Sequence, residues 1–136
     1  MAVILLAEDD DMSRDLLSRR LTKLGYTVVT ATHGQQAIDV ARNKHVDLIL
    51  MDLCMPGVDG LKATRMLRDH ESTASIPVIA LTALASATDV KRAILAGCND
   101  YETKPVVLPR LLLKMRKALP AAIGDAEANP RPSAPA

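Results

Sequence analysis

The chain has 136 residues, of which 49% are hydrophobic and 24% charged, a size and composition that suit one globular domain with one core. Seventeen basic and sixteen acidic side chains leave a net charge of +1, which gives no electrostatic reason to expect nucleic acid or an anionic membrane as a partner. With two tyrosines, no tryptophan and no phenylalanine, the chain also lacks the aromatic surface on which unpaired bases stack.

The cysteines and the N-terminal segment predict a soluble protein of the cytoplasm. Cys54 and Cys98 follow no metal-binding spacing, and no signal peptide precedes the opening "AVILLAE". No apolar run approaches the roughly 20 residues that cross a bilayer. Reduced thiols and no contact with the membrane are therefore expected.

Short apolar segments alternate with helical patterns along the chain. Strands are predicted at residues 3–7, 27–31, 47–53, 77–83 and, more weakly, 100–104. Apolar residues at helical spacing mark five helices, which contain in turn Met12, Leu16, Leu17, Leu21 and Leu24; Ala37, Ile38 and Ala41; Leu61, Thr64 and Leu67; Val90, Ala93 and Ile94; and Leu108, Leu111, Leu112, Met115 and Leu119. Gly25 and Gly97 end the first and fourth helices, and Pro109 fits the first turn of the fifth.

Five strands that alternate with five helices predict an α/β fold, a doubly wound parallel sheet of the flavodoxin-like (βα)5 type with strand order 2-1-3-4-5. We expect this domain to cover residues 1–119. Residues 120–136 are rich in proline and alanine and have few large apolar side chains, so a disordered tail is expected there.

Polar side chains follow the predicted strands, at the edge where such sheets bind ligands. Glu8 and Asp9 follow the first strand, Asp52 the third, Thr82 the fourth and Lys104 the fifth. Carboxylate oxygens from neighbouring strands suit a hard divalent cation, Mg²⁺ in particular. A carboxylate beside a metal can also attack phosphorus, provided that an ammonium and a hydroxyl group bind the incoming phosphoryl oxygens.

The acidic stretch "LAEDDD" has two interpretations. Glu8 and Asp9 would hold the metal, whereas Asp10 and Asp11 stand where the first helix begins and can cap its free N–H groups. Alternatively, all four acids form only a solvated cap and turn.

The segments "LAEDD", "LILMDLCMPGVDG", "IPVIALTA" and "AGCNDYETKP" together resemble the receiver domain of bacterial response regulators, the CheY-like phosphoacceptors of two-component signalling, over residues 3 to about 119. The resemblance implies that Asp52 accepts a phosphoryl group from a sensor histidine kinase or a histidine phosphotransfer protein. It implies that Asp9 binds Mg²⁺, or Mn²⁺ in its place, directly, that Glu8 binds it through water, and that the backbone carbonyl of Cys54 adds a ligand.

The same resemblance implies a switch. Thr82 would turn toward the phosphoryl group, Tyr101 would move from exposed to buried, and the peptide bond between Lys104 and Pro105 would be cis. A stand-alone regulator is then expected, with no enzymatic activity beyond its own phosphorylation and dephosphorylation. It would signal to an unknown downstream protein through the fourth helix, fifth strand and fifth helix, as a monomer or a homodimer.

Other interpretations stay open at this point. A metal-dependent phosphatase of the haloacid-dehalogenase type would need a second aspartate where Cys54 stands, and in a flavodoxin-type carrier Glu8 would repel the flavin phosphate. The alternative interpretation of Thr82 is an ordinary strand residue, and that of Tyr101 is a ring at the sheet edge. Cys54 is interpreted as an inert loop thiol, and the three histidines, His33, His45 and His70, are assigned to the surface.

Overall fold

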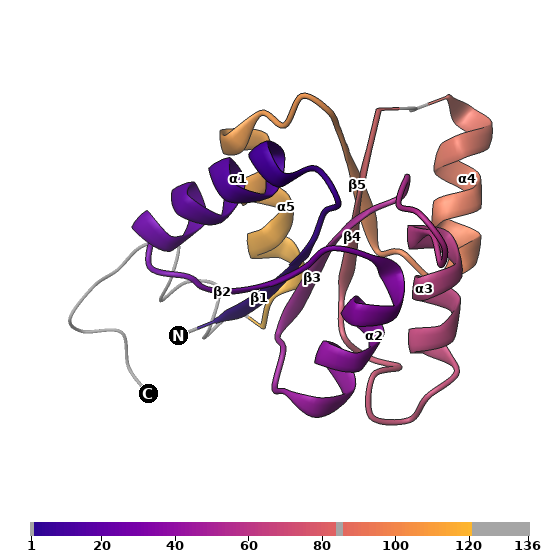
Figure 1. Cartoon of the computed structure of the whole chain (residues 1–136). Helices are drawn as coiled ribbons and strands as arrows, with labels where there is room; N and C mark the ends of the chain where they lie inside the picture. Colours follow the sequence, from indigo (N-terminus) through magenta and orange to yellow (C-terminus); the bar gives the residue numbers. More distant parts are fainter. Residues whose placement is uncertain (1, 84–85, 121–136) are drawn as a thin grey trace.

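A computed structural model of the chain describes residues 2–83 and 86–120, in which five β-strands alternate with five α-helices (Figure 1). The strands are β1 (Val3–Ala7), β2 (Thr27–Ala31), β3 (Leu48–Asp52), β4 (Val78–Thr82) and β5 (Asp100–Thr103). The helices are α1 (Asp11–Lys23), α2 (Gly34–Asn43), α3 (Gly60–Arg68), α4 (Ala87–Ala96) and α5 (Leu108–Ala118). Residues 121–136, nearly all of the predicted tail, lie outside the described part of the chain.

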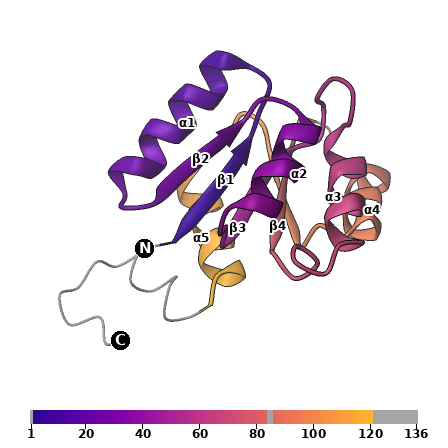
Figure 2. The ribbon, with the colours of Figure 1, turned by 60° about the horizontal axis from the view of Figure 1, so that its bottom comes forward.

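All neighbouring strands are parallel, and their order in the sheet is β2-β1-β3-β4-β5, as predicted. Helices α1 and α5 cover one face of the sheet, and α2, α3 and α4 cover the other (Figures 1 and 2). Each strand of the centre is therefore enclosed on both sides, which explains why β3 and β4 are buried along their whole length.

Alternation along the strands divides the core into two layers. Ile4 and Leu6 of β1 pack with α1 and α5, whereas Leu5 and Ala7 pack with α2 and α3. A shift of a strand by one residue would turn every one of its apolar side chains to the opposite face of the sheet. The burial of these side chains therefore also fixes the positions of the polar residues that follow each strand.

The apolar stripe predicted for the first helix is buried only in part. Leu17 and Leu21 are in the core, but Met12 and Leu16 are 83% and 53% exposed. Leu16 lines a groove at the protein surface rather than the core. The first turns of α1 thus present apolar side chains to solvent next to the edge where β1 ends.

The structure has two further features that bear on the sequence predictions. All three histidines are exposed, as predicted, and His33 accepts a hydrogen bond from the backbone N–H of Gln36 at the start of α2.

Within residues 2–83 and 86–120, no helix combines the length and the apolar character required to cross a membrane.

Candidate functional site

The register of the sheet brings the predicted site residues to one edge. Ala7 pairs with Met51, so the residues that follow, Glu8 and Asp52, emerge side by side from β1 and β3. Asp52 pairs with Leu81, the residue before Thr82. Thr82 in turn pairs with the residue before Lys104. Parallel pairing alone therefore gathers side chains from four separate segments.

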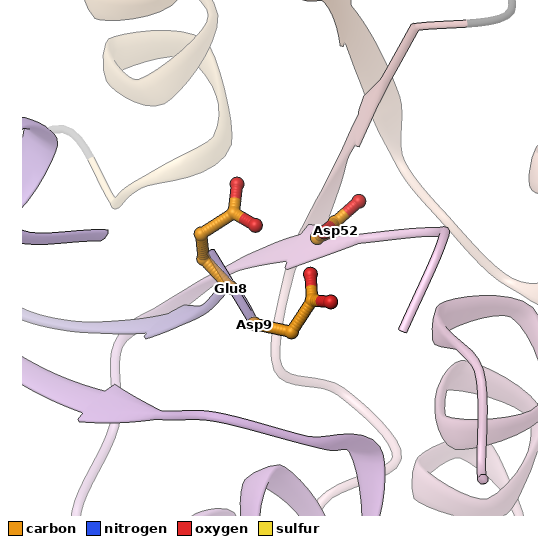
Figure 3. A group of neighbouring side chains, drawn as sticks. All are labelled: Glu8, Asp9 and Asp52. Carbon is orange, nitrogen blue, oxygen red and sulfur yellow. The ribbon is translucent and has the colours of Figure 1, made fainter. Parts of the chain in front are cut away.

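Three carboxylates meet at this edge. Ligand oxygens of Glu8, Asp9 and Asp52 all lie within 4.8 Å of one another. Figure 3 shows the Asp9 and Asp52 carboxylates facing a common space, with Glu8 beside them. Glu8 and Asp52 are only 3% exposed, whereas Asp9 is exposed to solvent.

This donor set fits a hard divalent cation. Oxygen ligands with a surplus of negative charge, partly open to water, are what Mg²⁺ prefers in proteins. A buried group of like charges without a compensating cation is costly, because each charge loses its hydration and repels the others.

Lys104 compensates part of that charge. Its Nζ lies 2.6 Å from Glu8 Oε1 and 3.3 Å from Asp52 Oδ2. The lysine side chain keeps 27% of its surface exposed, so the ammonium reaches into the cleft from its rim. Burial lowers the pKa of Lys104, but the hydrogen bond to Glu8 and the attraction of Asp52 raise it more, and the net pKa lies above its usual value.

The remaining excess of negative charge falls on Asp52. Burial and the neighbouring Glu8 carboxyl group raise the pKa of Asp52 to about 7, although a hydrogen bond from Cys54 and the charge of Lys104 act in the opposite direction. A proton therefore competes with any cation for this carboxylate near neutral pH.

The turn after β1 is held by its own acids and by Arg14. Asp10 accepts a hydrogen bond from the backbone N–H of Ser13 at 2.8 Å and so caps α1, as predicted. Glu8 Oε2 accepts one from the N–H of Asp10 at 3.1 Å, and Arg14 donates to the Glu8 carbonyl at 2.9 Å. Asp11 forms an ion pair with Arg14 instead of a second cap.

The loop after β3 orients Asp52. The backbone N–H of Cys54 donates to Asp52 Oδ1 at 3.0 Å. Gly60, the first residue of α3, lies so close that an added Cβ would be 2.3 Å from the Asp52 carbonyl oxygen. Only glycine allows α3 to begin against the end of β3, and this contact fixes the direction in which the loop leaves the strand.

The other predicted site residues lie around this cleft. Thr82 is 4% exposed and, with Cys54, lines a small pocket of about 160 Å³ next to Asp52's loop. The peptide bond between Lys104 and Pro105 is cis. Tyr101 is half-buried on β5.

One polar cluster beside the site, centred on Glu102, is not among the residues predicted from the sequence. Glu102 of β5 is buried and accepts hydrogen bonds from Arg110 and Lys114 of α5. The signal was present in the sequence, because a carboxylate in a predicted strand needs a cation, and α5 supplies several. The spacing alone did not show which of them would reach it.

Known proteins that are similar to this chain identify the family to which its fold and site belong. Residues 4–116 match the model of the response regulator receiver domain. The chain is also 37% identical over 123 residues to the polar-differentiation response regulator DivK of Brucella ovis, and the match covers 90% of this chain and 97% of the relative.

The chain is also similar to solved structures of receiver domains, two of which bear on the site. The receiver domain of the sensor histidine kinase PA1611 of Pseudomonas aeruginosa, which has a magnesium ion in its active-site cleft, superposes with a TM-score of 0.80 and 37% identity over 85% of this chain and 96% of that one. The receiver domain of Ssk1 of Saccharomyces cerevisiae was solved with the histidine phosphotransfer protein Ypd1. It superposes with a TM-score of 0.78 and 31% sequence identity, and the match covers 98% of this chain and 95% of that one. The chain therefore belongs to the response regulator receiver domain family and is a protein of two-component signalling.

Proposed function

We propose that this chain accepts a phosphoryl group on Asp52 from a sensor histidine kinase or a histidine phosphotransfer protein, in a reaction that requires Mg²⁺. The observation that carries the proposal is the convergence of one ammonium and three carboxylates, with Lys104 Nζ within 3.3 Å of Asp52 Oδ2. A phosphoryl group on that oxygen would lie within reach of the lysine.

The residues of the cleft have distinct parts in the transfer. An oxygen of Asp52 attacks phosphorus, the bond from phosphorus to the donor's imidazole nitrogen breaks, and the imidazole leaves and takes up a proton from solvent. Lys104 then pairs with a phosphoryl oxygen, and the Thr82 hydroxyl binds another.

Glu8, Asp9, Asp52 and the backbone carbonyl of Cys54 would hold the metal ion. When bound, Mg²⁺ supplies positive charge that offsets the charge of the incoming phosphoryl group, and Mn²⁺ has ligand preferences close enough to replace it. Burial and the neighbouring Glu8 raise the pKa of Asp52, and a cation held by these carboxylates would act in the opposite direction.

The donor is proposed to bind at the groove beside α1. This groove has a volume of about 350 Å³ and is lined by Leu16, Arg20 and Val106 as well as by Glu8 and Lys104 of the site. A partner that places an apolar helix face here would bring a phosphohistidine to the cleft. The complex of the yeast Ssk1 receiver with Ypd1 supports a phosphotransfer protein as the partner.

The signal is proposed to leave through α4, β5 and α5. Phosphorylation adds about two negative charges and three acceptor oxygens, which Thr82 can sense directly. Ile94, Leu95 and Leu113 are exposed on these helices and offer apolar contacts to a downstream protein. To reverse a two-state equilibrium from 1:99 to 99:1, the phosphoryl group must favour the active state by about 5.5 kcal/mol.

Two enzymatic or carrier functions are less well supported. A phosphatase of the haloacid-dehalogenase type would need an acid/base aspartate two residues after its nucleophile, where this chain has Cys54. A flavin carrier would place its phosphate beside Glu8 and Asp9. The cytoplasmic location, the lack of a nucleic-acid partner and the choice between monomer and homodimer stay predictions.

The test is incubation with acetyl phosphate and Mg²⁺, followed by measurement of the intact mass. The wild-type protein should gain one phosphoryl group, and Asp52→Asn should gain none. Equal labelling of the two proteins contradicts the proposal, and sustained release of phosphate from many small esters would favour the phosphatase.

A further inference from the structure

Lys114 of α5 reaches over the open edge of the sheet to Tyr101. Strand β5 stands at one end of the strand order, so within residues 2–83 and 86–120 no strand pairs with the other side of its backbone. Lys114 Nζ donates a hydrogen bond to the Tyr101 carbonyl oxygen and lies 4.8 Å from the centre of the Tyr101 ring. The same nitrogen donates to Glu102 Oε1 at 3.0 Å.

The charge of Glu102 is already balanced without Lys114. Arg110 Nε lies 2.9 Å and 2.6 Å from the two Glu102 oxygens, and Arg110 also donates to Thr103. The Glu102 side chain is 2% exposed, so a single well-placed guanidinium would satisfy it. Glu102 therefore does not require Lys114 as a second cation. The contact that only Lys114 makes, and Arg110 does not, is the one with Tyr101.

A lysine side chain is usually left free in solvent, because fixing it in one conformation costs rotamer entropy. Here a carbonyl oxygen, a carboxylate and an aromatic face together hold the ammonium, whose side chain is 22% exposed. A cation over an aromatic face is attracted to the negative face of the ring. That interaction depends on where the ring lies, whereas the hydrogen bond to the Tyr101 carbonyl does not.

The position of the ring is linked to the site by the strand itself. Tyr101 is three residues before Lys104 on the same segment, and its ring is half-buried against the core layer on the α3 side of the sheet. Any rotation that carries the ring away from α5 breaks the contact with the ammonium and leaves the backbone contact intact.

We propose that Lys114 is a positioning residue that holds the Tyr101 ring in the place seen here, and thereby opposes movement of that ring when the site is phosphorylated. The link to phosphorylation rests on the proposed function, but the effect on the ring does not. Lys114 thus raises the free energy that phosphorylation must supply to move the Tyr101 ring.

The first measurement uses no phosphate and no metal. The chain has two tyrosines, Tyr26 and Tyr101, so incorporation of 3-fluorotyrosine gives two ¹⁹F resonances, which Tyr26→Phe assigns. Lys114→Met keeps the apolar stem and removes the ammonium, and it should shift or broaden the Tyr101 resonance while Tyr26 stays in place. Lys114→Arg should restore the wild-type signal.

Arg116→Met is the matched control, because Arg116 is an exposed cation of the same helix. It should leave both resonances unchanged. A Tyr101 resonance that is identical in Lys114→Met and in the wild type would overturn the proposal. If Lys114→Met does not fold, Lys114→Gln is measured in its place and judged in the same way.

The second measurement adds Mg²⁺ and beryllium fluoride, a phosphoryl mimic, and follows the same resonance. Lys114→Met should reach the bound position of the ring at a concentration about two- to fivefold lower than the wild type. Equal midpoints would overturn the energetic part of the proposal. Absence of any response in wild type and variant alike would count against the proposed function, while the first measurement still decides the role of Lys114.

Discussion

Lys104 Nζ lies 3.3 Å from Asp52 Oδ2, and the same nitrogen lies 2.6 Å from Glu8 Oε1. One ammonium thus serves two buried carboxylates that emerge from neighbouring strands. The site therefore keeps a net negative charge, which a proton on Asp52 or a metal ion in the cleft would balance. Each of these outcomes can be measured separately.

Binding of Mg²⁺ should strengthen as the pH rises toward about 8. Because the pKa of Asp52 is about 7, its carboxylate is protonated in most molecules at about pH 6, and the ion must displace that proton. The apparent dissociation constant should fall by up to about tenfold per pH unit below 7 and level off above it. Calorimetric titration at several pH values tests this, and Asp52→Asn should show a much flatter dependence. Equal affinity of the wild type at about pH 6 and about pH 8 would contradict it.

Stability of the metal-free protein should change in the opposite direction. The pKa of Asp52 in the folded protein lies above its ordinary value of 3.8, so between these two pKa values the folded state binds a proton that the unfolded state does not. This contribution to the free energy of unfolding is complete below about pH 4 and is lost as the pH rises through about 7. Urea denaturation in the presence of a chelator should therefore show a decrease from about pH 6 to about pH 8, and added Mg²⁺ should reverse it. A rise over that interval without metal would argue against a raised pKa.

Lys104→Met should separate metal binding from phosphoryl transfer. The substitution removes a cation that competes with the metal ion for Glu8 and Asp52, so Mg²⁺ should bind at least as tightly as in the wild type. Labelling by acetyl phosphate should nevertheless be strongly reduced, because the phosphoryl oxygens lose their ammonium partner. Lys62→Met, an exposed residue of α3, is the control. Loss of both properties together would mean that Lys104 has a structural role only.

Arg68 should be among the most important side chains for stability. Its guanidinium donates to the carbonyl oxygens of Gly97, Ala74 and Ile76 at 2.7 to 3.1 Å and so joins the end of α3 to the segments before β4 and β5. Arg68→Met leaves these carbonyls without their donor and should lower the free energy of unfolding by about 2 to 4 kcal/mol. Urea denaturation measures this, and Arg65→Met, on the exposed side of the same helix, should change it by less than about 0.5 kcal/mol. Similar values for the two variants would show that the network adds little.

Much of this architecture follows from local sequence. The strands β1 and β2 have the predicted bounds, β3 and β4 are shorter than predicted by one residue at each end, and β5 by one residue at its C-terminal end. The agreement is close because continuous apolar runs are hard to misplace in a sheet that is covered on both faces. The positions of Glu8 and Asp52 follow from the parallel register once the strand order is known.

Other features depend on contacts that sequence patterns do not reveal. Met12 and Leu16 have the spacing of core residues, yet they are exposed, since that spacing does not show how far α1 extends beyond the sheet. The partners of Glu102 and Arg68 are set by the packing of α5 and α3, so neither cluster could be predicted from the local pattern.

The most direct test of the central claim is to locate the phosphoryl group. After treatment with acetyl phosphate and Mg²⁺, borohydride reduces an acyl phosphate to the corresponding alcohol, and peptide mass mapping then identifies the residue that carried it. We expect conversion at Asp52 alone, and only in the presence of Mg²⁺. Conversion at Asp9 or another acid, or labelling that persists unchanged without the metal, would contradict it.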